Sequence, residues 1–229
     1  MRFRLISPSC IAIIIAKEAS ELLYLKRKID AFLAEWKANP DRKPLIVKGP
    51  RQVGKTESIK QFGEMNYQSV IIINFVEEPK YKMITADGYK ADDIIKNISR
   101  MDPSKRFIEG ETLIFFDELQ EFPEISTALK FFKIDGRFDV ICSGSMLGIN
   151  YRKIESNSVG YKSDYEMFSL DFEEFLWANG ISEPVIAMLQ KALDAETPVP
   201  EALHSRMKQK PQKQRRQKQS LLKQKHPSL

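Results

Sequence analysis

The strongest constraint on the fold comes from a short stretch in which glycines, a lysine and a threonine separate two apolar patterns. The segment LIVKGPRQVGKTESIKQF occupies residues 45–62. It opens with a continuous apolar run that is typical of a buried strand, and from Lys55 onward it follows a helical pattern. Between the two, residues 49–56 match G-x-x-x-x-G-K-[ST], the spacing of a phosphate-binding loop. A strand, such a loop and a helix in this order predict an α/β chain.

Each residue type in this loop suits a bound triphosphate. The glycines let the backbone curl so that its N–H groups point at phosphate oxygens, and the helix that follows adds the positive end of its dipole. Lys55 can reach the β- and γ-phosphates, and the Thr56 hydroxyl can ligate Mg²⁺. The competing interpretation is an ordinary strand-to-helix turn with a surface lysine. We expect all of the loop to contact the nucleotide: Gly49, Pro50, Arg51, Gln52, Val53, Gly54, Lys55 and Thr56.

A second motif supplies the acids that such a loop requires. In TLIFFDELQEF, an apolar run ends in Asp117 and Glu118, about sixty residues after the loop. An acid at the end of a buried strand costs free energy unless it is paired, and a Mg²⁺ ion shared with Thr56 would pair it. Glu118 could then polarise a water aimed at the γ-phosphate. The competing interpretation is a strand that ends in a solvated acidic turn.

Two further strand ends carry polar side chains. Ser143 and Ser145, in VICSGS, could donate a hydrogen bond to the γ-phosphate or to the attacking water, or they could be turn or cap serines. Asn74, which closes the run IIIN, could orient Glu118 or could be a turn asparagine. These residues join the catalytic candidates Lys55 and Glu118.

Apolar runs alternate with helical patterns along most of the chain. Continuous apolar strands separated by helices indicate a parallel sheet that is covered on both faces. We expect strands over 43–49, 68–75, 111–118, 138–145 and 165–170, and helices over 18–38, 55–64, 91–101, 123–133, 171–180 and 183–195.

The charge is distributed unevenly. The net charge is +5, but residues 207–229 contain eight Lys or Arg and no acid. Without those eight, 28 basic residues remain against 31 acidic ones, a net charge of −3. The tail is low in apolar residues, so we expect it to be disordered when alone. The two cysteines lie far apart and form neither a disulfide framework nor a zinc spacing, which favours a reducing cytosol.

These patterns divide the chain into three parts. Residues 1–17 form a lead-in that imitates a signal peptide, but Pro8 interrupts its apolar run, which is also too short to span a bilayer. Residues 18–195 form the nucleotide-binding core, and residues 196–229 form the basic tail. We therefore expect a cytoplasmic protein that does not associate with a membrane.

Five segments together resemble a family of bacterial and archaeal AAA-type ATP-binding proteins, in which a C-terminal domain of unknown function follows the ATPase core. They are KPLIVKGPRQVGKTESIKQFG, IINF, TLIFFDELQEFP, SGSMLGI and LDFEEFLWANG, within roughly residues 24–190. The resemblance implies a three-layer P-loop NTPase of the additional-strand, catalytic-glutamate type, with a mainly parallel five-stranded sheet.

The resemblance also implies site roles and a departure from the family. It implies ATP as the nucleotide, Asp117 on Mg²⁺ and Glu118 as the base. It aligns the VICSGS serines with the family's sensor segment and Asn74 with a position that restrains the glutamate. Family members usually continue further, so we expect a truncated form. Arg137 and Arg152 are the candidates for an arginine finger, which is worth about 10³-fold or more in rate and often comes from a neighbouring copy.

Three functions are compatible with these features. The first is an ATP-binding protein with slow, Mg²⁺-dependent hydrolysis, acting alone or as a homo-oligomer. The second is a truncated module that binds nucleotide without turning it over. The third is weak, non-specific nucleic-acid binding through residues 208–225, which carry no aromatic residue for base stacking.

Overall fold

The computed structural model describes residues 24–145 and 160–195. The lead-in, the basic tail, Arg152 and Cys10 lie outside these ranges. Within the described part, residues Arg27–Leu170 form one compact unit, and residues 24–26 and 171–195 belong to a second. None of the helices in these ranges has the length and apolar character needed to cross a membrane.

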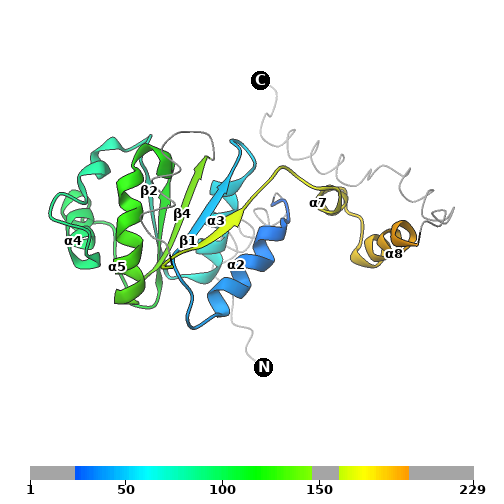
Figure 1. Cartoon of the computed structure of the whole chain (residues 1–229), viewed down its shortest axis with the longest axis horizontal. Helices are drawn as coiled ribbons and strands as arrows, with labels where there is room; N and C mark the ends of the chain where they lie inside the picture. Colours follow the sequence, from blue (N-terminus) through cyan, green and yellow to red (C-terminus); the bar gives the residue numbers. More distant parts are fainter. Residues whose placement is uncertain (1–23, 146–159, 196–229) are drawn as a thin grey trace, which may run out of the picture. The chain divides into compact units, whose positions relative to one another are not determined.

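The larger unit is built on a five-stranded sheet (Figure 1). The strand order is β2-β3-β4-β1-β5, and every neighbouring pair is parallel. This confirms the predicted parallel five-stranded sheet, in which β1, the strand before the phosphate-binding loop, lies between β4 and the edge strand β5. The strands are β1 (Leu45–Gly49), β2 (Ser69–Asn74), β3 (Thr112–Asp117), β4 (Asp139–Ser145) and β5 (Ser163–Glu166).

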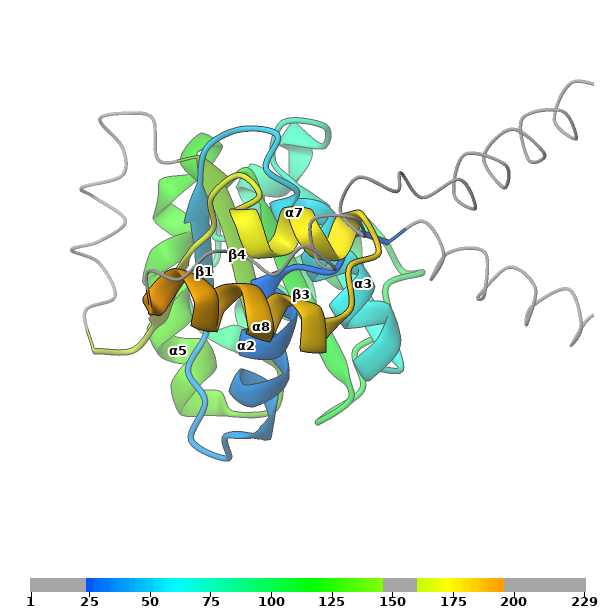
Figure 2. The ribbon, with the colours of Figure 1, turned by 90° about the vertical axis from the view of Figure 1, so that its right-hand side faces the viewer.

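Helices cover both faces of this sheet, as Figures 1 and 2 show. On one face lie α2 (Lys28–Ala38) and α3 (Lys55–Asn66), and on the other lie α4 (Ala91–Met101), α5 (Ala128–Asp135) and a 3₁₀ turn, η1 (Pro79–Met83). Strand β3 shows why helices must cover both faces of the sheet. All six of its residues are buried, with Leu113 and Phe115 in the core beneath α2 and α3, and Ile114 and Phe116 in the core beneath α4 and α5.

Two further short 3₁₀ turns follow β3. They are η2 (Leu119–Glu121) and η3 (Pro123–Thr127), and η3 leads directly into α5. The predicted helix over 123–133 therefore begins as a 3₁₀ turn. Strand β3 and turn η2 matter for function because they place the acidic pair and the residues after it beside the end of β4.

Two predicted elements have different bounds in the structure. Of the helix predicted over 18–38, residues 18–23 lie outside the described residues, residues 24–27 are not helical, and α2 begins at Lys28. The Asp30 carboxylate accepts a hydrogen bond from the Arg27 backbone N–H at 2.8 Å at this helix start. The strand predicted over 165–170 ends at Glu166. The apolar residues beyond it had suggested a longer strand, but Met167 is buried by packing in the core beneath α2 and α3.

The smaller unit contains α7 (Phe172–Ala178) and α8 (Glu183–Asp194). A capping box begins α7: the Asp171 carboxylate accepts from the Glu174 N–H at 2.9 Å, and the Glu174 carboxylate accepts from the Asp171 N–H at 3.1 Å. The two helices share a small core of Leu176, Val185, Ile186 and Leu189. Both helices lie where the sequence predicted them.

Candidate nucleotide-binding site

The phosphate-binding loop connects β1 to α3 at the end of the sheet where the carboxyl ends of the parallel strands lie. Gly54 precedes the helix with a φ of 96°, and Gln52 has a φ of 62°. Left-handed residues of this kind curl the backbone and turn successive N–H groups toward one side. Gly49 is required for a different reason, because a Cβ there would lie 2.0 Å from the Met167 carbonyl oxygen. The backbone at the end of β1 therefore packs directly against the backbone that follows β5, and no side chain fits between them.

Lys55 is folded back over this loop. Its Nζ donates to the Gly49 carbonyl at 3.0 Å and to the Pro50 carbonyl at 2.6 Å. Burial lowers the pKa of Lys55, while the negative charges of Glu118 and Asp117 oppose that change. The ammonium is thus partly desolvated and faces two acids.

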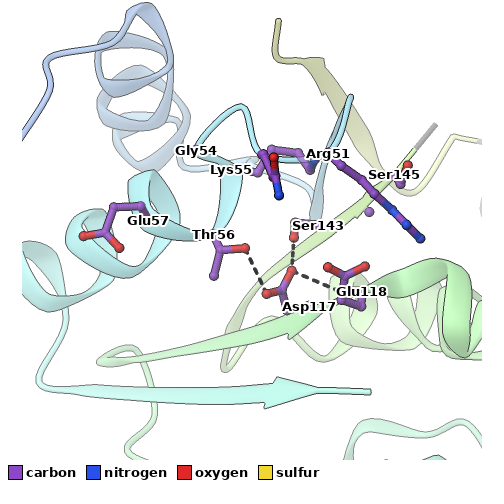
Figure 3. A pocket seen from close by; sticks show the side chains of 11 residues that line it. Arg51, Gly54, Lys55, Thr56, Glu57, Asp117, Glu118, Ser143 and Ser145 are labelled. Atoms are coloured by element: carbon purple, nitrogen blue, oxygen red, sulfur yellow. Dashed lines mark hydrogen bonds between the residues drawn. The ribbon is translucent and has the colours of Figure 1, made fainter. Parts of the chain in front are cut away.

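Asp117 is the centre of the polar network at this edge (Figure 3). It is 4% exposed, and the Thr56 hydroxyl donates to its Oδ2 at 2.9 Å. The Ser143 hydroxyl donates to Oδ1, and the Glu118 backbone N–H donates to the same oxygen at 3.0 Å. The structure therefore brings together the loop hydroxyl and the strand-end acid, which the sequence separates by 61 positions.

These oxygens form a donor set that fits Mg²⁺. Magnesium prefers hard oxygen ligands, keeps several waters, and is usually held by one or two protein groups together with substrate phosphates. Thr56 and Asp117 offer a hydroxyl and a carboxylate next to the loop that would hold the phosphates. Within the described ranges, no group of three or more His, Cys, Asp or Glu residues could hold a metal by itself.

Asp117 also contacts the two other strand-end candidates. The Ser143 hydroxyl donates to Asp117, and its contact with the γ-phosphate or the attacking water stays a prediction. The Asn74 amide lies 3.4 Å from Asp117 Oδ2, and its oxygen accepts from the N–H groups of Val76 and Glu77, which matches the turn asparagine that the sequence left open. Both residues lie at strand ends as expected, so their place was predictable and their partner was not.

Glu118 lies beside Asp117 in an uncommon backbone conformation. Its φ is 57°, a left-handed value that non-glycine residues adopt rarely and mostly at turns or functional sites. Its carboxylate accepts a hydrogen bond from the Gln120 side chain. Sequence reasoning gave Gln120 no role, although Gln120 lies within the TLIFFDELQEFP segment on which the family resemblance rests.

Arg27 is a second residue that sequence reasoning missed. It is 6% exposed; its Nη1 donates to the Val53 carbonyl of the loop at 2.6 Å, and its Nη2 donates to the Phe168 carbonyl at 2.7 Å. The arginine therefore fastens the phosphate-binding loop to the chain that follows β5. In the sequence it stands between two lysines inside the helix predicted over 18–38, where nothing distinguishes it.

The structure describes one of the two candidate arginine fingers, Arg137, but not the other, Arg152. Arg137 precedes β4, at the amino edge of the sheet, and pairs with Asp92, Asp135 and Glu109. It lies at the opposite edge from the loop and is not poised to act on phosphates in its own subunit. Arg152 lies outside the described residues. Arg51, from the loop itself, extends over the side of the cavity where Glu118 lies (Figure 3).

The loop, the acidic pair and the end of β4 enclose one cavity of about 430 Å³. Such a volume suits a small-molecule ligand. The residues lining it are Arg51, Gln52, Gly54, Lys55, Thr56, Glu57, Asp117, Glu118, Ser143, Gly144 and Ser145.

A parallel sheet with this loop after one strand and the loop's acidic partner after another defines a P-loop NTPase fold with a nucleotide-binding site. Comparison with family models gives a narrower assignment. The AAA domain family model matches residues 41–176, so the chain belongs to the AAA domain family. Both sequence motifs of the site lie inside the matched range, whereas Arg27 lies before it.

Solved structures were also compared. The chain is similar to PCH-2 of C. elegans, with 10% identity and a TM-score of 0.39, over 73% of this chain and 47% of that one. It is similar to Drosophila ORC bound to DNA, with 13% identity and a TM-score of 0.44, over 72% of this chain and 48% of that one. The chain therefore spans about half the length of each. No curated protein matches the sequence.

Proposed function

We propose that this protein binds ATP together with Mg²⁺ and hydrolyses it slowly. The observation that carries the proposal is the hydrogen bond between Thr56 and Asp117, which is 2.9 Å long. Thr56 is the last residue of the phosphate-binding loop, and Asp117 is the last residue of β3. A hydroxyl and a strand-end carboxylate in this relation form the protein part of a magnesium site for nucleotide phosphates.

The loop residues supply binding. Backbone N–H groups between Gly49 and Thr56 and the amino end of α3 stabilise the negative charge of the phosphates. Lys55 exchanges its two carbonyl acceptors for phosphate oxygens. When bound, Mg²⁺ neutralises charge on the phosphates and fixes their geometry; Thr56 and Asp117 would hold it, and Ser143 orients Asp117 through its hydrogen bond.

Glu118 supplies the base. Its carboxylate lines the cavity beside Lys55 and can take a proton from a water positioned for attack on the terminal phosphate. Hydrolysis is expected to be slow in one subunit. Of the residues lining the cavity, one is an arginine, and it belongs to the loop itself. An arginine contributed by a second copy would raise the rate by about 10³-fold or more, so we also propose that assembly accelerates turnover.

The test compares three proteins by calorimetry with ATP and Mg²⁺. Lys55→Ala should weaken ATP binding by about tenfold to a hundredfold, because a charge-assisted contact with phosphate is lost. Lys60→Ala, on the same helix but outside the cavity lining, serves as the matched control and should bind as the unaltered chain does. Equal affinity in all three proteins would refute the nucleotide site.

Phosphate release separates hydrolysis from binding alone. Glu118→Gln should bind ATP normally and hydrolyse it about 10²- to 10⁴-fold more slowly, the usual contribution of a general base. If the unaltered chain and Glu118→Gln release phosphate at the same rate, the protein is a nucleotide-binding module without turnover. Sedimentation with and without ATP then shows whether the nucleotide drives assembly, and a monomer under both conditions would contradict the oligomer.

A further inference from the structure

Turn η2 brings a side-chain amide between the candidate base and the end of β4. Gln120 Nε2 donates to Glu118 Oε2, and Gln120 Oε1 accepts from the Ser145 backbone N–H at 3.0 Å. Gln120 itself is not among the residues that line the cavity. It therefore contacts Glu118 from outside the space that a nucleotide would occupy.

The chemistry of the two neighbours determines how this amide is oriented. A backbone N–H can only donate, and an ionised carboxylate can only accept. A group that bridges the two needs an acceptor on one side and a donor on the other, and a carboxamide provides both on one rigid plane. The oxygen of Gln120 therefore faces Ser145, and its nitrogen faces Glu118. A glutamate at position 120 would keep the first contact and oppose the second with a like charge.

The backbone around this bridge is arranged to admit it. Gly144 has no side chain, and a Cβ there would lie 3.1 Å from Gln120 Oε1 and 3.3 Å from Leu119 Cβ. Contacts of that length are tighter than ordinary van der Waals packing. A side chain at position 144 would push η2 away from β4 and lengthen the bridge.

Glu118 is held at its backbone as well as at its carboxylate. Its N–H donates to Asp117 Oδ1 at 3.0 Å, and its carbonyl accepts from the Glu121 N–H at 2.9 Å. These two bonds maintain the left-handed conformation, and Gln120 holds one oxygen of the side chain. Within residues 24–145 and 160–195 the other carboxylate oxygen accepts no hydrogen bond, which leaves it available to accept the proton of a water.

We propose that Gln120 is the positioning residue for Glu118 and couples it to the end of β4. This inference rests on the proposed function, because it concerns the base of the same reaction. The sequence resemblance implies this restraining role for Asn74, but the Asn74 amide lies 3.4 Å from Asp117 Oδ2. Gln120 contacts the Glu118 carboxylate directly and connects it to Ser145, which lines the cavity.

The experiment measures kcat for ATP, Kd for ATP with Mg²⁺ and the thermal midpoint for the full chain. Gln120→Ala should lower kcat about tenfold, the equivalent of one hydrogen bond in the transition state. Gln120→Glu should lower it at least as much, because a like charge replaces the donor. Both variants should keep Kd within about twofold, because Gln120 does not reach the nucleotide. Gln68→Ala and Gln68→Glu, at an exposed position before β2, are matched controls for composition and charge.

A second pair of variants tests whether Gln120 acts through Glu118. Glu118→Asp keeps a carboxylate but shortens it by one methylene, which withdraws it from the Gln120 amide. Adding Gln120→Ala to Glu118→Asp should then lower kcat by less than about twofold. If the two residues acted independently, the fold losses in kcat of the two single variants would multiply in the double variant.

Each outcome decides the inference. It is overturned if Gln120→Ala leaves kcat within about twofold, if it raises kcat, or if Kd rises by more than about twofold and the thermal midpoint falls along with kcat. It is also overturned if the loss is equally large in the Glu118→Asp background. An unaltered chain that binds ATP without hydrolysing it would refute the proposed turnover and this inference together, and that result is recognisable before any Gln120 variant is made.

Discussion

Arg27 offers the sharpest test of how the loop is held. Its guanidinium donates to the carbonyls of Val53 and Phe168 at 2.6 and 2.7 Å, and the residue is 6% exposed. The carbonyl and N–H of a trans peptide point in opposite directions. Because Arg27 holds the Val53 carbonyl, the N–H of Gly54 in the same peptide points away from the guanidinium.

The informative substitution is Arg27→Met, which keeps the length of the side chain and removes its donors. Leaving a buried carbonyl without its donor costs about 1–3 kcal/mol, and two carbonyls are affected. Burying a guanidinium also costs free energy, which methionine avoids, so the lower end of the combined range applies. We expect the free energy of unfolding to fall by about 2 kcal/mol, or a thermal midpoint lower by about 4–8 °C for a chain of this size.

The same substitution should weaken nucleotide binding. Without Arg27 the loop must be ordered when ATP binds, and part of the binding free energy is used for that ordering. A cost of about 1 kcal/mol corresponds to a roughly fivefold higher Kd. Calorimetry with ATP and Mg²⁺ measures this, and thermal unfolding without ligand measures the first effect. Arg27→Lys, which retains the charge but lacks the planar fork that reaches two acceptors, should give an intermediate result.

Arg106→Met is the matched control, because it makes the same substitution at an exposed arginine that precedes β3 and is far from the loop in sequence. It should change neither quantity by more than the scatter typical of surface sites. If Arg27→Met unfolds at the lower temperature but binds ATP as tightly as the unaltered chain, Arg27 stabilises the fold without organising the loop. If neither quantity changes, the reasoning from its two buried hydrogen bonds is wrong.

Three further outcomes are expected. Gly49→Ala should destabilise the protein by about 3 kcal/mol in urea unfolding, because its Cβ would lie 2.0 Å from the Met167 carbonyl oxygen; an unchanged midpoint would contradict that geometry. Thr56→Val should reduce the gain in ATP affinity from Mg²⁺ by about tenfold, or about 1.4 kcal/mol, with binding in EDTA unaffected; an unaltered Mg²⁺ effect would exclude the hydroxyl as a ligand. Tyr67→Phe should cost about 1 kcal/mol near neutral pH, because the phenol donates to Asp139 at 2.8 Å. Burial raises the pKa of Tyr67, so the unfolded chain loses its phenol proton first and the unaltered protein loses this advantage above about pH 10. In unfolding measured from pH 7 to 11 the two proteins should therefore converge, and a constant difference would refute the assignment.

Much of the larger unit could be predicted from local patterns. Runs of apolar residues identified β1 to β4, and helical spacing identified α3 and α4 at nearly their observed bounds. The loop and the acidic pair were recognisable because their chemistry depends on residue types at short, set spacings. A parallel sheet then requires strand ends to meet at one edge, which was enough to predict that Thr56 and Asp117 lie together.

The partners of individual side chains could not be predicted in this way. Whether Asn74 and Ser143 contact Asp117 or Glu118 depends on the strand order and on the register between neighbouring strands. Asn74 is paired with Asp117 in the register of β2 and β3, and β4, which carries Ser143, lies on the other side of β3. A shift of one residue would turn each side chain to the other face. Apolar periodicity carries no information about which of two adjacent acids a neighbouring strand end will meet.

The residues found only in the structure act across long separations in sequence. Arg27 contacts Phe168 over 141 positions, and Gln120 contacts Ser145 over 25. Neither belongs to a repeating pattern. Each contacts a backbone group, and every residue has a carbonyl while every residue other than proline has an N–H. The sequence by itself therefore determined most of the strands and helices, the phosphate-binding loop and its acidic partner, because these depend on local spacing. Only the tertiary structure decided how the loop and the base are held, because that depends on which backbone groups the packed strands bring within hydrogen-bond distance.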